Sequence, residues 1–140
     1  MLKDTKYNDR TEQIIKAFYD VYNELGFGFL EKVYQNALYL ELKSRGFTAE
    51  PQKQIKVHFK GYEVGEYYPD LIVDDMVIVK LKAAEGIVEA FENQLINYLL
   101  ATKIEVGLLL NFGKKPEFRR KLFDNDRKKL HKYIHISFKG

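Results

Sequence analysis

The segment "VGLLLNF", residues 106–112, limits the fold more than any other part of the chain because it is almost continuously apolar. A strand with one face in water alternates apolar and polar side chains, whereas a strand buried on both faces is apolar throughout. We therefore expect residues 106–112 to be a strand inside a sheet that is covered on both sides. Helices on both faces are the natural cover, which predicts an α/β protein with a three-layer α/β/α sandwich.

Three amphipathic helices are available for this cover. Apolar residues recur at helical spacing from about Thr11 to Leu25, and Gly26 follows at the position of a C-capping glycine. A second helix is predicted before Gly46, and a third after Ala84. Their predicted apolar faces consist of Leu30, Val33, Tyr34, Ala37, Leu38 and Leu42, and of Ile87, Val88, Phe91, Leu95, Ile96, Tyr98 and Leu99.

Short strands are predicted between the second and third helices. Residues 55–59 alternate, Lys60-Gly61 marks a turn, and residues 67–73 form a second extended run. The pair Asp74-Asp75 then joins that run to "MVIVKLKA" in a β-hairpin, which places Asp70 beside Lys80 on neighbouring antiparallel strands. The predicted order of elements is ααβββαβ, and we expect its strands to form a central mixed sheet. Beyond it, residues 116–130 are interpreted as a basic helix and residues 132–138 as a closing strand.

The chain has the size and composition of one folded domain. Its 140 residues are 46% hydrophobic and contain no internal repeat or linker, so we expect a single domain over residues 1–140. The last part, from about residue 114 to 140, is a basic extension. It carries ten Lys or Arg residues against three acids, a net charge of +7, and leaves −4 on the rest. Such a tail favours binding to an anionic partner such as nucleic acid, or it is simply a solvated basic surface.

Cysteine content and hydropathy bear on where the protein works. The chain has no cysteine, as a reducing cytosol permits, and therefore no disulfide and no thiolate metal site. Its polar start is unlike a signal peptide, and no apolar run approaches the length that spans a bilayer. A cytoplasmic protein without a membrane partner is expected.

Lys80 and Lys82 are the unusual residues of the predicted hairpin. Because strand side chains alternate, Met76, Ile78, Lys80 and Lys82 share one face of a strand that otherwise looks buried. Two cations on such a face require a functional or a structural reason.

Several segments together resemble a known family. "GFGFLEKVYQNAL" resembles the Gly-x-x-Glu-x-x-Tyr signature of the GxxExxY proteins, with Gly28, Glu31 and Tyr34 at the defining positions. "GEYYPDLIVDDMVIVKLKA", "NQLINYL" and "VGLLLNFG" follow in the order of the same family, and the resemblance covers roughly residues 11–122. That family looks like a branch of the PD-(D/E)XK nuclease-like superfamily, which implies a restriction-endonuclease-like core.

The resemblance also implies a site. Asp70 takes the first acidic position, Lys82 takes the lysine position, Glu31 is the helix glutamate, and Gln94 resembles the glutamine of the following helix. Asp70 and Glu31 would be ligands of Mg²⁺ or Mn²⁺. Lys80 stands where the second acid is expected, and an ammonium group repels a divalent cation. The resemblance therefore implies a nuclease-like protein whose cleavage is weak or lost, and in which Lys80 neutralises Asp70 and Glu31.

Other interpretations remain open. Glu31 can simply favour the N-terminus of a helix, Gln94 can be a plain surface residue, and Tyr34 is expected to be a packing residue. The alternative function is a non-catalytic module on the same fold, which binds nucleic acid through Lys80, Lys82 and the basic tail. An interaction module or a self-associating homo-oligomer is a further alternative.

Overall fold

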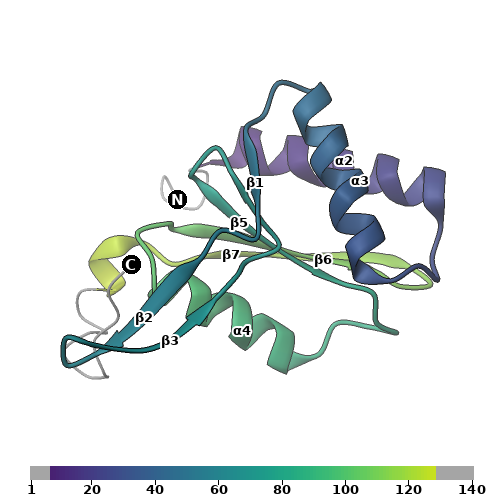
Figure 1. Ribbon diagram of the computed structural model, residues 1–140. Coiled ribbons are helices and arrows are strands. Elements are labelled where there is room, and N and C mark those ends of the chain that lie inside the picture. Colours follow the sequence, from purple (N-terminus) through teal and green to yellow (C-terminus); the bar gives the residue numbers. More distant parts are fainter. Residues whose placement is uncertain (1–6, 129–140) are drawn as a thin grey trace.

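The structure, a computed structural model, describes residues 7–128, which form three layers around a five-stranded sheet (Figure 1). Helices α2 (Asn8–Leu25) and α3 (Glu31–Ser44) cover one face of the sheet, and α4 (Glu89–Leu100) covers the other. Across the sheet the strands are β1 (Ala49–Pro51), β4 (Leu71–Val73), β5 (Val77–Lys82), β6 (Val106–Phe112) and β7 (Pro116–Leu122). The predicted α/β sandwich is confirmed.

The sheet is mixed, and its register determines which strand ends lie together. β5 pairs parallel to β6, whereas β1–β4, β4–β5 and β6–β7 are antiparallel pairs. The start of β4 and the ends of β5 and β6 therefore lie at one end of the sheet. Every residue of β6 is buried, as its apolar run predicted.

Each face of the sheet has its own apolar core. The larger core lies beneath α2 and α3, where the rings of Phe18 and Tyr34 pack against Phe112. The smaller core lies beneath α4 and consists of Ile72, Ile78, Leu95, Leu99 and Leu109. Because Gly107 has no side chain, Leu95 lies very close to the strand: a Cβ atom at position 107 would lie 2.7 Å from Leu95 Cδ1.

A two-stranded ribbon stands outside the main sheet. It comprises β2 (Ile55–Phe59) and β3 (Tyr62–Tyr67), joined at Lys60-Gly61. At its base the ring of Tyr67 stacks on Tyr98 of α4, with 4.1 Å between ring centroids. The extended run expected over residues 67–73 is therefore wrong as a single strand. It divides into the end of β3, a three-residue connection and β4.

The remaining differences concern the sheet edges and one helix face. β1 was not predicted, and residues 116–122 form strand β7 rather than part of a basic helix. The strand expected over residues 132–138 lies outside the described residues. On α3 and its N-cap, Val33 and Leu30 are exposed instead of buried, whereas Tyr34, Leu38 and Leu42 are buried as expected.

Candidate functional site

The β4–β5 hairpin brings Asp70 to the lysines. Asp70 follows the buried Pro69 and directly precedes β4, and its Oδ2 accepts a hydrogen bond from the backbone N–H of Leu81 at 2.7 Å. The register Leu71↔Val79 and Val73↔Val77 places the carboxylate beside the last residues of β5. The predicted neighbourhood of Asp70 and Lys80 is confirmed.

Lys80 and Lys82 lie on the α4 side of β5. The intervening Leu81 belongs to the core beneath α2 and α3, whereas Ile78 belongs to the core beneath α4. Lys82 Nζ lies 4.5 Å from the ring centroid of Phe91, and Lys80 Nζ lies 5.8 Å from that of Tyr98. Aromatic faces attract cations, and long lysine stems can pack along apolar surface, so this face accepts two half-buried lysine side chains.

The pKa of Asp70 is raised above its ordinary value of 3.8, and burial of the carboxyl group is the largest cause. The hydrogen bond from Leu81 and the positive charge of Lys80 oppose this rise, whereas the negative charge of Glu31 adds to it. Lys82 also opposes it, to a smaller extent. Burial therefore dominates the two cations, which leaves Asp70 a carboxylate that is costly to ionise.

Lys80 does not form the direct ion pair that would replace a metal. Among residues 7–128, no ion pair of 4.0 Å or less joins Lys80 to Asp70 or Glu31. Glu92 does not replace the missing acid either, because it binds Lys121 at 2.6 Å. Lys80 thus acts on Asp70 through space, from a position over the Tyr98 ring.

Tyr67 and Tyr98 are residues of this site that the sequence did not single out. The Tyr67 hydroxyl donates a hydrogen bond to the carbonyl oxygen of Tyr98 at 2.9 Å. The pKa of Tyr98 is raised, first by burial and then by the charge of Asp70, and burial also raises the pKa of Tyr67. Tyr98 fits an ordinary apolar helix pattern, and its place against Lys80 depends on how α4 packs on β5, so no local signal identifies it.

Glu31 and Gln94 lie at the margin of the site. Glu31 is the exposed first residue of α3, and its negative charge contributes to the raised pKa of Asp70. Gln94 is exposed on α4, three residues after Phe91 and four before Tyr98, so it borders the helix face that meets the lysines. Asp70, Lys80 and Lys82 therefore come together, Glu31 lies within electrostatic range, and Gln94 stays at the edge.

This set of side chains fits a divalent cation poorly. Hard cations take several oxygen ligands, and Lys80 offers none at the position of the expected acid. One oxygen of Asp70 already accepts the Leu81 N–H. Within the described part of the chain, no group of three or more His, Cys, Asp or Glu side chains is arranged to hold a metal ion.

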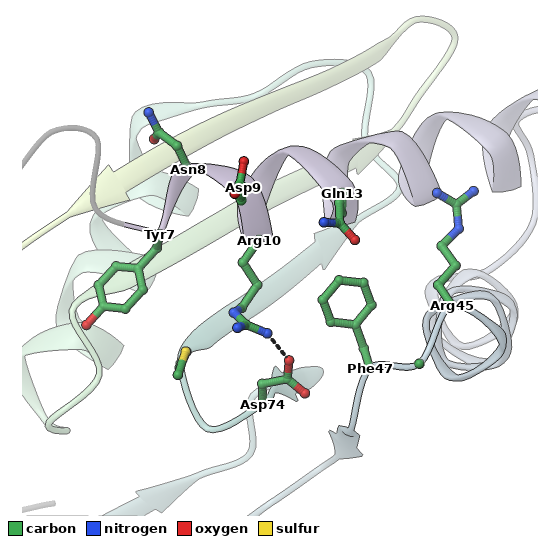
Figure 2. A pocket seen from close by; sticks show the side chains of 10 residues that line it. Tyr7, Asn8, Asp9, Arg10, Gln13, Arg45, Phe47 and Asp74 are labelled. Carbon is green, nitrogen blue, oxygen red and sulfur yellow. Dashed lines mark hydrogen bonds and ion pairs between the residues drawn. The ribbon is translucent and has the colours of Figure 1, made fainter.

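A hollow lies at the opposite end of the same hairpin. It has a volume of about 760 Å³ and is lined by Tyr7, Asn8, Asp9, Arg10, Gln13, Arg45, Gly46, Phe47, Asp74 and Met76. Figure 2 shows Arg10 reaching across it to Asp74, with which it forms an ion pair. Arg45 is likewise paired, with Asp20 and with Glu41. Both arginines of this hollow are paired with acids of the protein itself, so the hairpin end with Asp70 remains the candidate site.

A mixed five-stranded sheet with helices on both faces is consistent with the class of restriction-endonuclease-like α/β domains. The sequence profile of the PD-(D/E)XK nuclease superfamily matches residues 8–121, and the chain belongs to this superfamily. The crystal structure of SSO0001 is similar, with 15% identity and a TM-score of 0.49. That likeness covers 93% of this chain and 66% of the SSO0001 chain. No curated protein matches.

In residues 7–128, no helix has the length and apolar character needed to cross a membrane.

Proposed function

We propose that this protein binds nucleic acid through Lys80 and Lys82 at the nuclease-like site, and that it does not cleave phosphodiesters by the divalent-metal route of active superfamily members. The observation that carries this proposal is the pair of half-buried lysines on the α4 face of β5, with Lys80 at the position where a metal-binding acid is expected. Membership of the nuclease superfamily supports nucleic acid as the partner.

The charges of the site argue against strong metal binding. Glu31, Asp70, Lys80 and Lys82 sum to zero when all four are ionised, whereas an acid at position 80 would leave −2. One unit charge at about 4 Å and an effective dielectric constant near 20 contributes roughly 4 kcal/mol. Burial, which raises the pKa of Asp70, also makes its ionised form, the form that binds a metal, costly.

The same charges favour a phosphate group. An ammonium group is a compact charge with three donors, and it binds a phosphate without the planar geometry that a guanidinium requires. Lys82 is held over the Phe91 ring, so part of the cost of ordering its side chain is met before a ligand binds. Binding should therefore depend on both lysines and weaken with salt, through release of counterions from the nucleic acid.

Charge-removing variants test the binding. Lys80→Met and Lys82→Met keep the apolar stem and remove the ammonium group. We expect each to weaken binding of a fluorescent oligonucleotide, measured by anisotropy, and to flatten its salt dependence. Lys103→Met is the matched control, because Lys103 is exposed and precedes the start of β6 at the other end of the sheet. Equal affinities for all four proteins would refute the proposal.

A charge reversal tests the metal part of the proposal. Lys80→Glu places a second carboxylate beside Asp70, and we expect it to bind Mn²⁺ measurably by calorimetry while the parent protein binds much less. Cleavage of plasmid, single-stranded DNA or RNA in Mg²⁺ or Mn²⁺ should be confined to the variant. Metal-dependent cleavage by the parent protein that disappears in Lys82→Met would contradict the proposal and support a working nuclease.

A further inference from the structure

Four exposed apolar side chains gather where α2 meets α3. Phe27, Phe29, Leu30 and Val33, which we call the joint patch, are 56%, 46%, 80% and 39% exposed. Leu30 and Val33 fit the apolar face of a buried helix by spacing, yet they face outward. A group of large apolar side chains exposed on one short segment is a candidate binding surface.

The joint patch is held in place by its backbone. Gly26 and Gly28 have φ angles of 69° and 110°, which other residues rarely adopt. The buried Tyr34 hydroxyl donates a hydrogen bond to the carbonyl oxygen of Gly26 at 2.7 Å and accepts one from the N–H of Phe29 at 3.2 Å. The Tyr34 ring stacks on Phe112 of β6, so the connection is anchored to the central sheet. The exposure of the phenylalanines is therefore built into the fold.

The joint patch lies at the same end of the molecule as the lysines. The α2–α3 connection, the β6–β7 turn and the connection from β5 to α4 lie at the same end of the sheet, at the right of Figure 1. The Tyr22 hydroxyl ties α2 to that turn through the carbonyl oxygens of Gly113 and Lys114, at 2.8 and 2.7 Å. The turn also carries the exposed Lys115. The patch thus shares its end of the sheet with four lysines, namely Lys80, Lys82, Lys114 and Lys115.

Exposed rings beside cations match the chemistry of unpaired nucleotides. Each nucleotide of a single strand offers a base face for stacking and a phosphate for a cation, whereas a duplex keeps its base faces covered. We propose that the protein prefers single-stranded nucleic acid, whose bases stack on Phe27 and Phe29 while the lysines of the same end contact its phosphates. This inference rests on the proposed function and names its substrate class. The charge complementarity of the lysines favours this occupant over a second copy of the chain.

Three probes separate stacking from charge. Anisotropy is measured with one labelled oligonucleotide as a single strand, as a duplex and as an abasic strand that keeps the phosphates without bases. The parent protein should bind the normal single strand tightest. Phe27→Ala and Phe29→Ala should weaken that binding by about 5- to 100-fold and leave the abasic strand nearly unchanged. Tyr62→Ala, an exposed aromatic residue on β3 of the ribbon, is the control and should change none of the affinities.

The outcomes distinguish this inference from the proposed function. Phe29 touches the Tyr34 ring edge-on, whereas Phe27 stacks on no ring among residues 7–128, so Phe27→Ala is the variant least able to disturb folding. If the lysine variants weaken binding but the phenylalanine variants keep the full preference for the normal strand, the stacking inference fails and the proposed function stands. If the parent protein binds none of the three probes, both fail. If sedimentation shows a dimer that Phe27→Ala dissociates, with no change in the strand preference, the patch is a self-association surface and the inference is overturned.

Discussion

At the scale of single residues, Asp70 lies in the candidate site with a carboxyl group that burial makes costly to ionise. Its carboxyl group is half-buried, and one oxygen accepts the Leu81 N–H. Neither neighbouring lysine forms a close ion pair with it among the described residues. A group that is costly to ionise and incompletely compensated is typical of sites rather than of stabilising networks.

The raised pKa of Asp70 leads to a prediction for stability against pH. Between pH 3.8 and the raised pKa, the folded protein binds more protons at this group than the unfolded chain, so this contribution to the free energy of unfolding falls as pH rises. Asp70→Asn keeps an oxygen for the Leu81 N–H and removes the charge. We expect the variant to be the more stable protein at pH 7, by a margin that shrinks toward pH 4. Urea unfolding of both proteins over this range measures the margin, and a parent protein that is more stable at pH 7 would contradict the expectation.

Part of the site could be predicted from residue pattern alone. Alternation along a strand placed Lys80 and Lys82 on one face, and the hairpin turn placed Asp70 near them; both statements concern residues close in sequence. The rings that hold the lysines come from α4, and their position depends on how a helix packs across a sheet. That is tertiary information, as is the stacking of Tyr67 from β3 on Tyr98, which explains why both tyrosines were missed. The roles of Asp70, Glu31, Lys82 and Gln94 in metal binding or catalysis stay predictions.

At the scale of helices and strands, clear apolar patterns were reliable guides and the two edge strands were not predicted. The first helix and β6 appear with the expected type and nearly the expected bounds. β1 has three residues, too few to show alternation. β7 is an edge strand that begins at a proline and carries Arg119, Arg120 and Lys121, features that suit an edge but look helical and basic in isolation. Its strand conformation comes from pairing with β6, which the local sequence does not encode.

The β4–β5 turn gives a prediction at this scale. Asp74 and Asp75 both have positive φ angles, 53° and 55°, as the two central residues of a type I′ hairpin turn require. Glycine adopts this conformation without strain, so Asp75→Gly should raise the free energy of unfolding by about 0.5–1 kcal/mol. The lost ion pair with Lys53 matters little, because the Asp75 side chain is 75% exposed.

Asp75→Ala is the control for this turn, since it loses the same ion pair but keeps a Cβ atom at positive φ. We expect it to be no more stable than the parent protein. Thermal unfolding of the three proteins tests the order, and a gain in Asp75→Ala equal to that in Asp75→Gly would show that backbone strain is not the cause. Asp74 is left intact, because it binds Arg10 and the Thr48 N–H.

At the scale of the whole molecule, the two cores share β5 and β6. Successive residues of these strands face opposite layers, so Leu81 packs beneath α2 and α3 while Leu109 packs beneath α4. A shift of either strand disturbs both layers, and small domains of this size commonly unfold in one cooperative transition. We therefore infer that the helices on the two faces unfold together.

Matched truncations test this coupling. Leu81 and Leu109 are both fully buried, and each Leu→Ala change should cost about 2–5 kcal/mol of unfolding free energy. Both variants should retain one transition, with coincident curves from far-UV circular dichroism and tyrosine fluorescence. Hydrogen exchange provides the opposing outcome: rapid exchange confined to α4 in Leu109→Ala, with the α2–α3 layer still protected, would show that the layers unfold separately.

The ribbon of β2 and β3 has a practical consequence for engineering the protein. Within residues 7–128 its two strands pair with each other and with no other strand. At its base Ile55 packs against the core beneath α4 and Tyr67 stacks on Tyr98, and its far end is the Lys60-Gly61 turn, with positive φ at both residues. Exposed turns that carry no part of a core tolerate insertions best. In Figure 1 this turn points away from the α2–α3 connection. A peptide tag or a reporter domain placed between Lys60 and Gly61 would leave both cores intact and the lysine-bearing end of the sheet accessible. This turn is therefore a suitable insertion site for immobilising or labelling the protein.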